Sequence, residues 1–243
     1  MDARFVEYMR ERDLCMDATY DCPYQWLRRA VNADKLSATN RTWGKSYQQL
    51  ADAIAGSGRY EQVATVCVFR LGNNPRDGLV RGRRAGPRAI MDAAGGGLEG
   101  FKSYVRTMPC GESRHRMVLS REKMADAVPY VARKLAQLET VASETVASLE
   151  ALQNQAIDYF LAVQQRKLKY HSLQIALDMY NLGLVEVADT SDCPLEAGAK
   201  RGLARIPGGT VKGLAALAGR EAHEVQTALC GYNKAEKANW RGA

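Results

Sequence analysis

Residues 46–56 read SYQQLADAIAG and open the stretch around which the whole chain is organised. Ser46 is a good N-cap, because its hydroxyl accepts a hydrogen bond from an amide of the first helical turn. Apolar residues recur at helical spacing up to Ile54, glycine interrupts them at residues 56–58, and a second apolar run covers Val63–Leu71. Two short helices joined by a glycine-containing turn are typical of DNA-binding proteins whose second helix enters the major groove. The stretch therefore predicts a helix-turn-helix, although many helical hairpins share this pattern.

An arginine-rich loop follows the second predicted helix. Residues 70–88 contain six arginines and a single acidic residue, Asp77, and glycine and proline interrupt them. A guanidinium offers a flat fork of donors that suits phosphate. We therefore expect the loop to lie along a DNA backbone or in a minor groove, with a solvated loop without a partner as the alternative. With a C-terminal motif described below, the candidate contacts are Tyr47, Arg59, Gln62, Thr65, Arg70, Arg76, Arg81, Arg83, Arg84, Arg88, Arg220 and Gln226.

The order of motifs after residue 56 supports a family resemblance. Asn74-Pro75 is followed by the strand-like residues 78–80, by Arg-Gly-Arg-Arg at 81–84 and by a glycine-rich segment at 95–102. In this order, residues 44–105 resemble the DNA-binding domain of O6-alkylguanine-DNA alkyltransferases and alkyltransferase-like proteins. The resemblance places the family's Pro-Cys-His-Arg box on residues 81–84, with glycine at the position of the acceptor cysteine. Without a thiolate there is no alkyl acceptor, so the resemblance implies a protein that binds DNA and has lost alkyl transfer. An ordinary helix-turn-helix with a similar local sequence is the alternative.

Composition narrows the class of protein. The chain has 243 residues, a formal net charge of +7 and a sequence pI of about 9.1, which favours polyanionic partners. It has no apolar run of about 18 residues and no secretory signal pattern, so we expect no membrane partner and a cytoplasmic, intracellular location. Six cysteines without a CxxC pair and three isolated histidines favour reduced thiols over a metal site. We expect no metal and no other cofactor.

A heptad-like repeat runs from Met124 to Val163, with apolar residues at alternating spacings of three and four. This pattern predicts a long helix that needs an apolar partner. The partner is either a second chain, which would make a homo-oligomer through residues 124–163, or a helix at residues 165–182 that folds back.

The C-terminal residues predict a second helical pair. Residues 184–209 look like a connector, and the spacing of Ala215, Gly219 and Val225 within residues 210–231 fits a small helix-turn-helix. Arg220 and Gln226 would then face outward and pair with base edges. The alternative is a helical hairpin that packs on the body of the protein.

Together these patterns predict a mainly α fold with a helix-turn-helix N-terminal region, a long heptad-bearing helix and a small C-terminal helical hairpin. The expected domains are 1–118 for nucleic-acid binding, 119–183 for oligomerisation and 184–243 as linker and C-terminal domain. The predicted function is non-enzymatic, oligomeric DNA binding in regulation, packaging or partition, or alkyl-lesion recognition, with RNA as the other candidate nucleic acid. A structural or assembly protein with a basic RNA- or protein-binding surface is the alternative.

Overall fold

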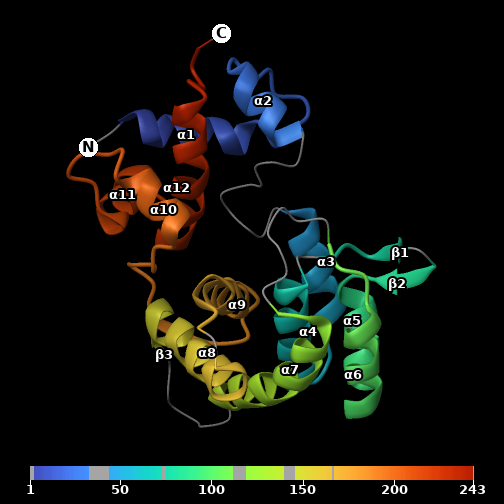
Figure 1. Ribbon diagram of the computed structural model, residues 1–243. Helices are drawn as coiled ribbons and strands as arrows, with labels where there is room; N and C mark the ends of the chain where they lie inside the picture. The colour runs from blue at the N-terminus through green and yellow to red at the C-terminus, as the bar shows by residue number, and fades with distance from the viewer. Residues whose placement is uncertain are drawn as a thin grey trace. The chain divides into compact units, whose positions relative to one another are not determined.

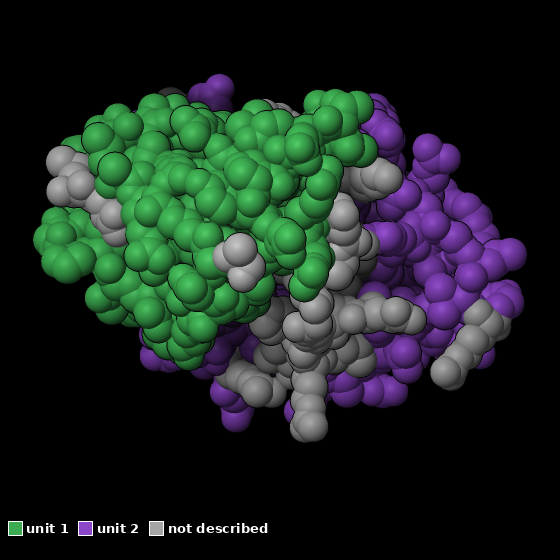
Figure 2. Space-filling model, turned by 90° about the horizontal axis from the view of Figure 1, so that it is seen from above, with its two compact units in different colours: residues 1–44, 189–243 green, residues 45–188 purple. Residues whose placement is uncertain are grey.

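The computed structural model describes residues 3–32, 44–72, 75–80, 82–111, 119–139, 146–165 and 167–242. These residues form twelve α-helices and two small two-stranded sheets (Figure 1), which confirms the mainly α prediction. The chain divides into two compact units, coloured separately in Figure 2. Unit 1 contains residues 1–44 and 189–243, and unit 2 contains residues 45–188. The N- and C-terminal segments thus fold together, in contrast to the three consecutive domains expected from the sequence.

Unit 2 is built around one central helix, α4. Its elements are α3 (Lys45–Ile54), α4 (Arg59–Leu71), β1 (Gly78–Val80), β2 (Arg83–Ala85), α5 (Pro87–Gly95), α6 (Leu98–Thr107), α7 (Arg121–Ala136), a 3-10 turn (Gln137–Glu139), β3 (Val146–Ser148), α8 (Leu149–Gln164) and α9 (Lys169–Asn181). Helix α4 packs against α3, α5, α7 and α9. Because residues 63–69 are apolar or small on every face of the helix and all are buried, α4 has neighbours around its whole circumference.

The predicted long helix over residues 124–163 is wrong. The apolar repeat belongs to two helices, α7 and α8, which pack against each other, while α9 packs on α8. Helix α7 ends at Ala136, and α8 begins after Ser148, which has extended backbone dihedrals, ends β3, and accepts a hydrogen bond from the amide of Ala151 at 3.1 Å as the N-cap of α8. Residues 140–145, in the middle of the predicted seam, lie outside the described residues. Leu135 and Leu149 are both 0% exposed within unit 2, whereas Val163 at the end of the repeat is 37% exposed.

Unit 1 joins the two ends of the chain through aromatic packing. Its helices are α1 (Ala3–Leu14), α2 (Gln25–Asn32), α10 (Ala197–Leu203), α11 (Val211–Ala218) and α12 (Ala222–Lys237), and the strand β4 (Val187–Asp189) leads into it from unit 2 and pairs with β3. Phe5 and Tyr8 of α1 contact the ring of Tyr232, and Tyr8 also contacts Trp240 at 5.5 Å between ring centroids. Trp240 is fully buried. Such large buried rings contribute strongly to a core, which explains why segments about 230 residues apart form one unit.

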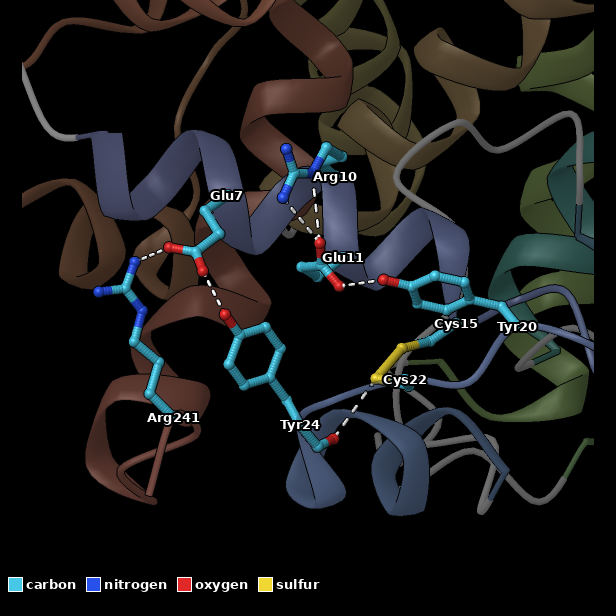
Figure 3. Close-up of polar contacts among 8 residues, drawn as sticks. All are labelled: Glu7, Arg10, Glu11, Cys15, Tyr20, Cys22, Tyr24 and Arg241. Carbon is cyan, nitrogen blue, oxygen red and sulfur yellow. Dashed lines mark hydrogen bonds and ion pairs between the residues drawn. A yellow bond between two sulfur atoms is a disulfide. The ribbon is translucent and has the colours of Figure 1, made fainter. Parts of the chain in front are cut away.

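A disulfide between Cys15 and Cys22 corrects the expectation that all cysteines are reduced (Figure 3). It closes the loop between α1 and α2, with a Cα–Cα distance of 5.8 Å. The same loop is tied to α1 by tyrosine hydroxyls: Tyr20 donates to Glu11 at 2.7 Å, and Tyr24 donates to Glu7. The spacing of seven is also that of two cysteines on one helix face, but α1 ends at Leu14 and the chain turns back.

Over the described part of the chain, none of the helices combines the length and the apolar content required to cross a lipid bilayer.

Candidate nucleic-acid interface

The helix predicted to recognise DNA is not accessible. The predicted pair of helices is present as α3 and α4, joined through Gly56, which has a φ of +72°. Thr65, expected to face outward, is 0% exposed, and its hydroxyl lies 3.8 Å from the sulfur of Met91. Gln62 is partly buried and donates through Nε2 to the carbonyl of Ile54 at 3.0 Å. The prediction that α4 enters a groove is therefore wrong, because α4 is the central core helix of unit 2.

The side chain of Arg70 is also largely buried within unit 2. Its side chain is 12% exposed, and Nε and Nη2 both donate to the carboxylate of Asp178 on α9, whose side chain is 0% exposed. Burial alone would lower the pKa of Arg70, but the neighbouring charge of Asp178 outweighs it and raises that pKa, so the guanidinium stays charged. Arg70 thus joins α4 to α9 instead of contacting phosphate.

The other candidates on α3 and α4 are only partly available. Tyr47 is 7% exposed, so its ring belongs to the core of unit 2. Arg59 begins α4 and is partly buried, with its Nε and one terminal nitrogen withdrawn from solvent. Tyr47 is therefore corrected as a candidate contact, whereas Arg59 stays a candidate that is only partly exposed.

The arginine-rich loop forms an exposed β-hairpin. Strands β1 and β2 pair antiparallel, with Leu79 opposite Arg84 and Val80 opposite Arg83 (Figure 1). Every residue of β1 is exposed, including Leu79 at 73% and Val80 at 44%. The hairpin is a two-stranded ribbon that is open to solvent on both sides of β1, and this exposed apolar pair was not predicted from the sequence.

The base of the hairpin is closed by one glycine and one aspartate. Gly86 has a φ of +94°, and a Cβ at this position would lie 2.3 Å from the backbone nitrogen of Asp77, so a side chain does not fit. Asp77 in turn accepts a hydrogen bond from the amide of Arg88 at 3.0 Å, in the first turn of α5. This arrangement fixes where the ribbon leaves the body of unit 2.

The predicted arginines of the hairpin that are described are all exposed: Arg76, Arg83, Arg84 and Arg88. Arg84 pairs with Asp92 at 2.9 Å and Arg88 pairs with Asp77 at 3.7 Å, and both guanidinium side chains remain about two-thirds exposed. Arg83 donates to the carbonyl of Thr107 at 2.8 Å, at the C-terminus of α6. The structure therefore brings these four predicted residues together, whereas Arg81 lies outside the described residues.

A tyrosine of α6 forms a hydrogen bond with strand β2 of the hairpin. Tyr104 of α6 donates through its hydroxyl to the carbonyl of Arg84 at 3.3 Å. Burial raises the pKa of Tyr104 to about 12, so the hydroxyl keeps its proton and remains a donor at neutral pH. This contact and the Arg83–Thr107 hydrogen bond hold β2 against α6.

The second predicted DNA-binding helix faces inward. Thr210 caps α11 by accepting from the amide of Gly213 at 3.0 Å, and Gly219 ends α11 with a φ of +61°, as the sequence predicted. However, Arg220 donates to Asp13 of α1 at 3.1 Å, and Gln226 is 4% exposed. The outward assignment of these two residues is wrong, and the alternative of a helical hairpin packed on the body is confirmed.

The other features that bear on chemistry among the described residues are a surface depression, the placement of metal-binding side chains and a buried thiol. An open depression of about 340 Å³ is lined by residues of α4, α7 and the α5–α6 junction, and only Glu61 and Arg133 among its lining residues carry a charge. No group of three histidine, cysteine or acidic residues in the described ranges is placed to hold a metal ion. Cys67 is buried, and desolvation raises its pKa to about 12, so it is a thiol and not a nucleophilic thiolate at neutral pH.

Gly82, which the alkyltransferase resemblance aligns with the acceptor cysteine, lies in the exposed turn between β1 and β2. Its φ is +74°, and nothing lies within 4 Å of the position that a Cβ would take. Comparisons of the chain with protein-family models, curated proteins and solved structures found no match.

Proposed function

We propose that this protein is a non-enzymatic nucleic-acid-binding protein that contacts its ligand through the arginine hairpin, defined as residues 76–88. The observation that carries this proposal is a solvent-exposed two-stranded ribbon with Arg83 and Arg84 on β2 and Arg76 and Arg88 at its base. A two-stranded ribbon fits the major groove of B-DNA, and guanidinium groups beside it suit the phosphates.

The ion pairs of the hairpin leave its arginines available to phosphate. Exposed pairs such as Arg84–Asp92 and Arg88–Asp77 contribute only about 0–1 kcal/mol each. Exchange of a weakly held carboxylate for a phosphate therefore costs little. The gain comes from the counterions that leave the nucleic acid when its phosphates are neutralised.

The proposal assigns DNA as the first ligand and RNA as the second, and it leaves α4, Arg220 and Gln226 out of the interface. Of the predicted processes, regulation and packaging or partition need only contacts of this kind. Alkyl-lesion recognition rests on the family resemblance alone, and Gly82 offers no alkyl acceptor there. Self-association through residues 124–163 stays a prediction, but it has less support because most of the described apolar residues of the repeat are buried within unit 2.

An assembly protein remains the second candidate function, and one observation favours it. Leu79 and Val80 are exposed apolar residues on the edge of a ribbon, and such an edge also fits a strand from a protein partner. The two functions differ in their dependence on salt, since apolar contacts do not weaken when salt is added.

The test is a salt titration of duplex binding, measured by fluorescence anisotropy. The variant Arg83→Ala/Arg84→Ala/Arg88→Ala should bind every duplex sequence more weakly and lower the salt slope by up to about three, close to one unit for each phosphate that is no longer neutralised. The matched control is Lys123→Ala/Arg133→Ala/Lys134→Ala, which removes the same charge from the exposed side of α7 in the same unit. Equal slopes for the two triple variants would refute the hairpin as the interface.

A further inference from the structure

Several exposed cations of unit 1 lie on or next to two helices that pack together, α10 and α12. Residues 197–219 contain four lysines and arginines and no acidic residue. Lys200 and Arg201 of α10, Arg205 just beyond it, and Lys234 and Lys237 of α12 are all exposed. We name these five residues the α10/α12 basic face.

The close packing of α10 and α12 brings together the two segments that carry these cations. A Cβ on Gly202 would lie 2.0 Å from the carbonyl oxygen of Leu229, so the backbones of α10 and α12 touch at this point without a side chain between them. Arg205 then donates through Nε to Asn233 of α12 at 2.9 Å, which holds its side chain against α12. Arg201 lies in α10, four residues before Arg205.

The cations of this face differ from those of the arginine hairpin in whether acidic residues pair with them. In the hairpin, Arg84 and Arg88 each have a carboxylate within 4 Å. Among the described residues, none of the five cations of the α10/α12 basic face has an acidic partner within that distance, and Arg205 donates to a neutral amide. The acid nearest along α12, Glu236, is already paired with Arg4 and accepts from Trp240. The positive potential of the face is therefore left for an external anion.

The chemistry of the face favours a phosphate backbone over a lipid surface. Stable binding of a peripheral protein to a lipid surface commonly combines cations with apolar side chains that enter the lipid. Of the described large apolar residues that are exposed, none belongs to α10 or α12, and Leu217 of α11 is the nearest in sequence. A row of cations without apolar neighbours fits a linear polyanion, whose charges repeat along its length.

We infer that the α10/α12 basic face is a second nucleic-acid contact, which neutralises phosphates of a bound strand or duplex independently of sequence. This inference rests on the proposed nucleic-acid binding and adds a separate surface in the other unit. It requires no contact between the units, because each surface binds phosphate by itself.

The experiment uses the full chain and a fluorescently labelled duplex in a salt titration. The variant Arg201→Gln/Lys234→Gln removes one cation from each helix, and Arg28→Gln/Arg29→Gln removes the same charge from the exposed side of α2 in the same unit. The first variant should lose about ten- to hundredfold in affinity at low salt and about two units of salt slope, whereas the control should stay near the parent. The charge-preserving variant Arg201→Lys/Lys234→Arg should bind like the parent.

Several outcomes separate this inference from the proposed function. Equal loss in the two double variants, or no loss in either, would overturn the basic face while the hairpin stands. Loss in Arg201→Gln/Lys234→Gln together with an unaffected hairpin variant would support the basic face and overturn the hairpin. A parent protein that ignores duplex and single strands but binds phosphatidylserine vesicles would overturn both, since the anion would then be a lipid.

Discussion

The buried ion pair between Arg70 and Asp178 should be among the most sensitive points of unit 2. Asp178→Asn keeps the shape of the side chain but removes its charge, so a guanidinium that is 12% exposed would lose its carboxylate. Breaking a buried pair by removing one partner costs about 3–5 kcal/mol, because the remaining charge is left uncompensated. Natural domains are stable by only about 5–15 kcal/mol, so this single substitution should remove a large share of the stability.

A double-mutant cycle separates the cost of an uncompensated charge from the cost of poorer packing. Arg70→Met and Asp178→Asn should each destabilise strongly, whereas Arg70→Met/Asp178→Asn should cost much less than their sum, because no charge stays buried. Urea unfolding at pH 7, followed by far-UV circular dichroism, gives the three free energies. The matched control is the exposed pair Arg106–Asp126, at 3.4 Å, whose disruption should cost less than about 1 kcal/mol.

The reasoning would be refuted by single variants that lose less than about 1 kcal/mol, or by a double variant whose loss equals the sum of the singles. The same double variant also checks the position of Arg70 in the interior. Its affinity for duplex should equal that of the parent, since Arg70 contacts Asp178 and not phosphate.

Three further predictions concern the core and the cysteines. Burial raises the pKa of Cys67 to about 12, so the thiol of the unfolded chain ionises first and the free energy of unfolding should fall by about 1.4 kcal/mol per pH unit between about pH 9 and 12. Cys67→Ala should flatten this decline when the free energy of unfolding is measured by urea titration at each pH. Parallel pH profiles for the parent and the variant would contradict the prediction. Cys15→Ser/Cys22→Ser should lower the free energy of unfolding by about 2–3 kcal/mol, since the disulfide closes a loop with a sequence separation of 7. Thiol titration of the denatured, unreduced parent should count four thiols, and a count of six would contradict the disulfide. Leu135→Lys should lower stability by several kcal/mol, because Leu135 is 0% exposed inside unit 2; a smaller particle with intact folding in light scattering would instead restore the oligomer interface.

Local signals predicted the helices well, because caps and breaks depend on neighbouring residues. Thr210 and Gly219 delimit α11 as expected, and glycine at residue 56 separates α3 from α4. One local prediction was wrong: Ser46 lies inside α3, which begins at Lys45, and is not its N-cap.

Which face of a helix is buried depended on partners far away in sequence. Helix α4 is apolar almost all round, so its own periodicity could not show that Thr65 faces inward. The partner of Arg70 is 108 residues away, and no pattern near Arg70 indicates it. For the same reason the end of α7 at Ala136 was missed, since the apolar spacing continues from α7 into α8.

The exposed hairpin was predicted in part. Its arginines indicated a surface loop, because they could not be buried without partners, and four of them are exposed in the structure. The pairing of β1 with β2 and the exposure of Leu79 depend on Gly86 and on α6, which the sequence pattern did not connect to the loop.

The central claim is that nucleic acid lies against the arginine hairpin, and hydrogen exchange measured by mass spectrometry tests it most directly. At low salt and saturating duplex, peptides covering β1 and β2 should exchange more slowly than in the free protein, because a bound ribbon is shielded and rigidified. Peptides from α7, whose cations serve as the control, should exchange at the same rate in both states. Unchanged exchange at residues 78–85 in a fully bound sample would contradict the proposed interface.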